Sequence, residues 1–116
     1  MADLHPRQDP PIKLLVIICT YNRAHLLRQT LLCLAEEIER PVNCKLGVLV
    51  VNNCSTDNTD EVINSFRQRL PLLSVQEHQP GLSNARNRGI EEAIRWGADY
   101  IVWTDNDIRP HRQWLT

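Results

Sequence analysis

The residues best suited to chemistry in this sequence are Asp105 and Asp107, which stand one residue apart directly after the apolar run 100–104. Two carboxylates this close raise the cost of ionising one another, and such hard oxygen ligands favour Mg²⁺ or Mn²⁺. The metal would carry a phosphate-containing substrate. An acidic turn after an edge strand is the alternative interpretation, and an isolated Asp-x-Asp pair leaves both open.

The segment 20–23 contains side chains that suit nucleotide binding. Tyr21 could place its ring against a base, and Arg23, or the N-terminal amides of a following helix, could face anionic oxygens. The alternative is a loop in which Asn22 caps that helix. These residue types are therefore compatible with a nucleotide, and with ordinary helix capping as well.

Two more polar segments can likewise be interpreted either as ligand-binding or as ordinary turn and helix-start residues. Asn52 and Asn53 follow an apolar run, and each amide both donates and accepts, so the pair can read a base edge or form an Asx turn. Asn84 and Arg86 lie near the start of a later helical segment. A guanidinium there can bind phosphate or ribose oxygens bidentately, and a solvated helix start is the alternative.

Elements that could position these segments alternate along the chain. Apolar runs predict strands and helical spacing predicts helices, with the ranges strand 14–19, helix 24–37, strand 46–51, a helix from Ser55, strand 72–76, helix 83–96 and strand 100–104. Ser55 is the expected N-cap of the second helix, and Gly97 is the expected end of the third.

The order βαβαβαβ predicts an α/β fold with a Rossmann-like parallel sheet, helices on both faces and right-handed crossovers. In such a sheet the βα loops and the loop after the last strand fall on one edge, where ligands bind. The four polar segments are therefore expected to converge. A dinucleotide-binding domain is disfavoured, because no Gly-x-Gly-x-x-Gly follows the first strand.

The composition predicts one domain in a chain of 116 residues, 42% of them hydrophobic, after a flexible N-terminal segment 1–11. The net charge of −1 excludes a general nucleic-acid or anionic-membrane binder. The four cysteines lack zinc-site spacing and are expected to be reduced thiols. Without a signal-peptide pattern or a membrane-spanning run, a cytoplasmic location is expected, and membrane association through a partner or a further segment stays open.

Four segments together resemble family 2 glycosyltransferases of the GT-A fold: CTYNR at 19–23, VVNNCSTDNT at 50–59, GLSNARNRGI at 81–90 and WTDNDIRP at 103–110. The resemblance covers about residues 13 to 116. It implies that residues 12–116 are the N-terminal, nucleotide-sugar-binding half of a GT-A domain. Such enzymes transfer a sugar from a nucleotide-diphosphate donor to an acceptor hydroxyl, usually with Mn²⁺ or Mg²⁺.

The resemblance also implies roles for single residues. Thr20 and Tyr21 match nucleoside contacts, and Arg86 matches an Arg that contacts the donor nucleotide. Asn53 stands where the family commonly has an Asp that reads the base, so it is expected to discriminate uracil less sharply, and Asn53→Asp to sharpen a preference for UDP. The expected substrate-binding residues are Thr20, Tyr21, Arg23, Asn52, Asn53, Asn84, Arg86 and Asp105.

Asp105 and Asp107 match the metal-binding DxD motif of the family. The acceptor-binding half and the carboxylate that acts as catalytic base in inverting members are expected beyond Thr116. A UDP-sugar is the favoured donor, whereas the sugar, the acceptor and the stereochemical outcome are not predicted. An uncovered sheet edge makes self-association a further expectation.

Two other functions stay open at the level of sequence. One is a nucleotide-binding module or truncated fragment without turnover. The other, ranked lower, is a phosphohydrolase with Asp105 as nucleophile, because that class normally has its Asp-x-Asp motif on the first strand rather than the last.

Overall fold

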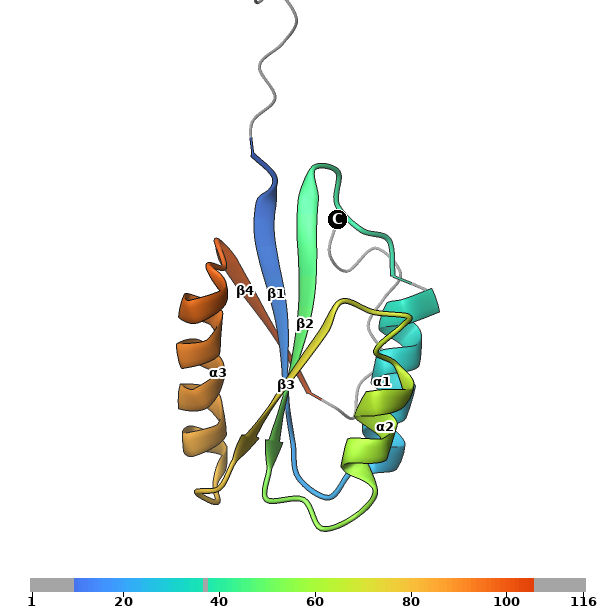
Figure 1. Cartoon of the computed structure of the whole chain (residues 1–116), viewed down its shortest axis with the longest axis vertical. Helices are drawn as coiled ribbons and strands as arrows, with labels where there is room; N and C mark the ends of the chain where they lie inside the picture. The colour runs from blue at the N-terminus through green and yellow to red at the C-terminus, as the bar shows by residue number, and fades with distance from the viewer. Residues whose placement is uncertain (1–9, 37, 106–116) are drawn as a thin grey trace, which may run out of the picture.

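The computed structural model describes residues 10–36 and 38–105, and it confirms the predicted alternation of strands and helices. The elements are β1(Ile12–Thr20), α1(Ala24–Glu36), β2(Cys44–Asn53), α2(Thr59–Ser65), β3(Leu72–Glu77), α3(Leu82–Trp96) and β4(Tyr100–Asp105). All strand pairs are parallel, and the strand order is β3-β2-β1-β4 (Figure 1).

The helices cover both faces of the sheet, with α1 and α2 on one face and α3 on the other (Figure 1). The sheet grows from β1 through β2 to β3, and the α3 crossover then returns to place β4 on the opposite side of β1. Because such crossovers are right-handed, this reversal sends α3 to the other face. The boundary of β1 and β4 is therefore the switch point beside which ligands bind in open α/β sheets.

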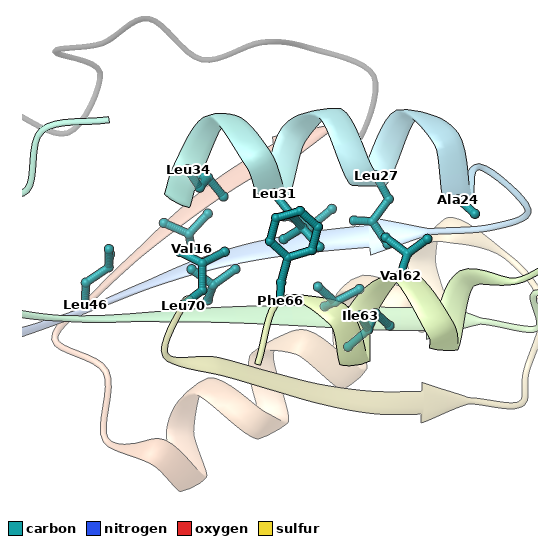
Figure 2. Packing of buried hydrophobic residues seen from close by; sticks show 13 residues of the cluster. Val16, Ala24, Leu27, Leu31, Leu34, Leu46, Val62, Ile63, Phe66 and Leu70 are labelled. Carbon is teal, nitrogen blue, oxygen red and sulfur yellow. The ribbon is translucent and has the colours of Figure 1, made fainter. Parts of the chain in front are cut away.

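The apolar runs of β1 and β2 are buried on both faces, as expected for central parallel strands. On β1, Val16 and Ile18 pack with α1 and α2, whereas Leu15 and Ile17 pack on the α3 side. Figure 2 shows the first of these clusters, in which Phe66 lies between α1 and the sheet. This packing fixes the strand ends that carry the polar segments.

Helix boundaries differ from the predicted ones at one informative place. The second helix begins at Thr59 with Asn58 as its N-cap, so the prediction that Ser55 caps it is wrong. Cys54 has a φ of 64°, which turns the chain away from β2 before the helix can start. The Ser55 hydroxyl instead accepts a hydrogen bond from the Asn22 N–H at 2.9 Å.

The other boundaries agree closely with the predicted ranges. Helix α3 begins one residue early at Leu82 and ends at Trp96, and the following Gly97 has the left-handed φ of 85° typical of a residue that terminates a helix. None of the helices within 10–36 and 38–105 has the length and apolar character needed to cross a bilayer. In the described part of the sheet β3 and β4 are the outer strands, and self-association through either edge stays a prediction.

Candidate functional site

A pocket of about 720 Å³ lies at the carboxyl ends of β1 and β2, facing the start of α3. It is lined by Cys19, Thr20, Tyr21, Arg23, Asn53, Cys54, Pro80, Gly81, Leu82 and Ala85. Figure 1 shows the loops that contribute these residues together at the lower end of the sheet. The predicted residues Thr20, Tyr21, Arg23 and Asn53 are thus brought into one cavity by segments far apart in the sequence.

The β1–α1 loop that carries Tyr21 and Arg23 is locked to the loop after β2. Asn22, at a φ of 49°, donates from its backbone N–H to the Ser55 hydroxyl, and its Oδ1 accepts from Thr56 N–H at 2.6 Å. Thr20 is buried, whereas Tyr21 is 59% exposed. The hydrogen bonds of Asn22 therefore hold the backbone next to Tyr21, while the side chain of Tyr21 stays exposed to a ligand.

Asp57 caps α1 from outside that helix. Its Oδ2 accepts from the Ala24 N–H at 3.1 Å, and its Oδ1 accepts from the Thr59 N–H at 3.1 Å and from the Thr59 hydroxyl. The hydroxyl of Thr59, helped by these N–H groups and opposed by desolvation, lowers the pKa of Asp57 from its ordinary value of 3.8. One carboxylate thus organises the starts of both α1 and α2.

Asn52 does not line the pocket, although it was expected to bind substrate. Its Nδ2 donates to Asp60 Oδ1 at 2.9 Å, and its Oδ1 accepts from the Ser55 N–H at 3.2 Å. The side chain is 2% exposed. Asn52 therefore holds the 54–58 loop and the first turn of α2, in agreement with its Asx-turn interpretation.

Asn53 lines the pocket and is tied to the segment 77–81 across it. Its Nδ2 donates to the carbonyl oxygens of Glu77 at 3.1 Å and Gln79 at 2.8 Å. Its Oδ1 accepts from the Gly81 N–H at 3.1 Å. The side chain is 6% exposed.

Asn84 and Arg86 lie on the first turns of α3 but outside this pocket. Asn84 Nδ2 donates to the Pro80 carbonyl at 3.0 Å. Arg86 is exposed and lines a second hollow of about 470 Å³ with Trp103 of β4. The N-cap Gly81 supplies no side-chain hydrogen bond to α3, and Gly81 and Leu82 line the pocket, so the positive end of that helix borders it.

Asp105 is the last residue of β4 and pairs in register with Cys19, which lines the pocket. The backbone at Asp105 therefore stands at the same edge of the sheet as the cavity. Asp107 lies outside the described residues. In the part of the chain that the structure describes, no three His, Cys, Asp or Glu side chains gather closely enough to hold a metal ion.

The sequence predicted that the loop before α3 lies at this edge, but it did not single out Pro80, Leu82 and Ala85, or the thiols of Cys19 and Cys54, as lining residues. The Pro80-Gly81 pair is a turn signal that could have drawn attention to the wall formed by the first three. Cys54 offered no such signal. Its Sγ donates to the carbonyls of Glu77 and His78, a contact that only the folded chain creates.

Comparison with known proteins gives consistent results. The sequence pattern of the family described as Glycosyl transferase family 2 matches residues 15–116. Glycosyltransferase AglE from Haloferax volcanii is 35% identical over 102 residues, which are 86% of this chain and 32% of that relative. The chain thus spans about a third of the length of this curated relative.

Two solved structures have the same fold over most of the chain. TarS 1-349 from S. aureus, in complex with UDP, has a TM-score of 0.75 at 26% identity, covering 90% of this chain and 30% of the TarS 1-349 chain. The mannosyltransferase PcManGT from Pyrobaculum calidifontis, in complex with GDP-Man and Mn²⁺, has a TM-score of 0.71 at 30% identity. That match covers 89% of this chain and 30% of the mannosyltransferase.

Proposed function

Because the chain belongs to glycosyl transferase family 2, which it matches over residues 15–116, we propose that its pocket binds the nucleoside diphosphate of a nucleotide sugar. The sugar is then transferred to an acceptor hydroxyl. The observation that carries this proposal is the cavity of about 720 Å³ at the carboxyl ends of β1 and β2. Its size and its place in a doubly wound sheet suit a ligand of this kind.

Each wall of the pocket suits one part of the ligand. The exposed ring of Tyr21 offers a surface on which a base can stack. Arg23 and the N-terminus of α3 supply positive charge for the diphosphate. Thr20 and Asn53 line the same cavity, while Arg86 lines the second hollow and is proposed to contact the donor nucleotide from there.

We propose Asp105 and Asp107 as ligands of Mn²⁺ or Mg²⁺. The fit is supported by carboxylate chemistry, which suits these hard cations, and by the register of Asp105 beside the pocket-lining Cys19. A bound divalent ion supplies Lewis-acid stabilisation of the negative charge on the leaving diphosphate. The mannosyltransferase structure with GDP-Man and Mn²⁺ adds support from a relative.

A uridine donor is proposed over a guanosine donor. TarS was solved with UDP and the mannosyltransferase with GDP-Man, so the family fold accepts both bases. TarS 1-349 was also solved with UDP-GlcNAc, a second uridine nucleotide, which supports the choice of a uridine donor. UDP is therefore the first ligand to test.

Calorimetric titration of the chain with UDP, in Mn²⁺ and in EDTA, tests the pocket and the metal separately. UDP is expected to bind at least about tenfold more tightly with Mn²⁺, and Asp105→Asn should remove that difference. Asp99→Asn, at the opposite end of β4, is the matched control and should retain it. Equal affinity in Mn²⁺ and EDTA contradicts the metal site, and no binding of UDP or GDP in either solution contradicts the nucleotide pocket.

A further inference from the structure

Asn53 uses both the nitrogen and the oxygen of its amide group to hold the opposite wall of the pocket. Its two strong acceptors, the carbonyls of Glu77 and Gln79, lie on the nitrogen side, and the Gly81 N–H lies on the oxygen side. Two carbonyl oxygens on one side and one N–H on the other determine which end of the amide is nitrogen. A carboxylate in the same place could serve only the Gly81 N–H.

The segment 77–81 depends on this contact because it has little regular structure of its own. It connects β3 to α3, and its residues Pro80 and Gly81 line the pocket. The Glu77 carboxylate also stabilises the segment: it accepts a hydrogen bond from the Gln79 N–H at 2.8 Å and lies 3.8 Å from the Arg88 guanidinium. From the β2 side the segment is held by Asn53 and by the longer contacts of the Cys54 thiol.

We propose that Asn53 is a positioning residue that keeps the segment 77–81 and the start of α3 in place as a pocket wall, and that a neutral amide is required for this. The proposal rests on the nucleotide-binding function proposed above. Since the Nδ2 hydrogens are engaged by two carbonyls, the amide can offer a base only the second lone pair of Oδ1.

This role reverses the expectation from sequence for Asn53→Asp. By resemblance to the family, an Asp at this position sharpens a preference for UDP. In this structure the new carboxylate would face the carbonyl oxygens of Glu77 and Gln79, losing two hydrogen bonds and adding repulsion. The variant should therefore weaken UDP binding, and the preference for its base should not improve.

The first test compares UDP affinity of the wild-type chain and Asn53→Asp in Mn²⁺ at about pH 8 and about pH 5. At the higher pH the variant should bind at least about tenfold more weakly. At the lower pH the ratio of wild-type to variant affinity should fall to less than half of its value at the higher pH. The reason is that the two carbonyls raise the pKa of the new carboxyl, and its protonated form again donates one hydrogen bond. Asn64→Asp adds the same charge on the exposed end of α2 and should follow the wild type.

The ratio at each pH corrects for other titrating groups near position 53. The wild type carries the same Cys54, Glu77, His78, Arg23 and Arg88, so their protonation affects both proteins alike. A residue that only reads the base gives the reverse result. Equal or tighter UDP binding by Asn53→Asp at about pH 8, or a ratio that does not fall at about pH 5, overturns the positioning role.

The second test needs no nucleotide. Hydrogen exchange of the Gly81 amide, followed by NMR, should be at least about tenfold faster in Asn53→Ala than in the wild type, while the Val50 amide in β2 stays protected. An unchanged exchange rate of the Gly81 amide contradicts the positioning role of Asn53. If Gly81 responds but the wild type binds no nucleoside diphosphate, the proposed function fails and the positioning of the segment stands, so the two failures are distinguishable.

Discussion

Asp57 Oδ2 accepts a hydrogen bond from the Ala24 N–H at 3.1 Å, so a residue after β2 caps the helix that follows β1. Because Asn22 also binds this loop, the pocket-lining segment 20–23 is held at Asn22 and directly after Arg23. Such a fastening limits the conformations of Tyr21 and Arg23 before any ligand arrives. We therefore expect Asp57, in the loop after β2, to affect nucleotide affinity through the position of this segment rather than through a contact of its own with the nucleotide.

Asp57→Ala is expected to lower the free energy of unfolding by about 1 kcal/mol, because a helix cap is lost. It should also weaken UDP binding by a few-fold, since the backbone of Tyr21 and Arg23 is less restrained. Urea unfolding and calorimetry measure the two effects. Glu91→Ala, on an exposed position of α3, is the control. Unchanged stability of Asp57→Ala would refute the cap.

The contribution of Asp57 to stability should depend on pH. Its folded-state pKa is lowered from 3.8, chiefly by the Thr59 hydroxyl, so the unfolded chain binds the proton more readily. The stabilisation is therefore complete above 3.8 and is lost as the pH falls through the lower folded-state pKa. Urea unfolding at about pH 6 and about pH 3 should show a smaller loss for Asp57→Asn than for the wild type. Identical losses would contradict this assignment.

Tyr21→Ala should weaken UDP binding by about tenfold, whereas Tyr21→Phe should retain most of the affinity, because stacking on a base needs the ring rather than the hydroxyl. Tyr21 is 59% exposed, so neither change should alter stability appreciably. Tyr100→Ala is the matched control, since Tyr100 is 62% exposed at the opposite end of the sheet. Calorimetry with UDP in Mn²⁺ measures all three. Equal affinity of Tyr21→Ala and the wild type would exclude stacking.

Bound UDP should protect the thiols of Cys19 and Cys54 against alkylation, because both line the pocket. At a UDP concentration of about ten times Kd the rates should fall about tenfold. Cys44 begins β2 at the other end of the sheet and serves as an internal control whose rate should not change. Mass spectrometry of alkylated peptides resolves the sites. Equal rates at Cys54 with and without UDP would place the nucleotide elsewhere.

The sequence by itself determined the architecture. Strands such as 14–19 and 46–51 are apolar on both faces, and only a parallel sheet covered by helices buries both. Alternating helices then bring the strand ends to one edge, so the convergence of Tyr21, Arg23 and Asn53 followed from local patterns. These signals are short-range, and a single sequence contains them.

Only the tertiary structure decided which hydrogen-bond partners Asn52 and Asn53 have. The pleat of β2 sends the two side chains to opposite faces, Asn52 toward Asp60 and Asn53 toward the segment 77–81. Likewise Asp57 caps α1 as well as starting its own helix. Asn, Ser and Asp form the same hydrogen bonds with near and distant partners, so their residue types could not reveal which partner folding would bring within reach.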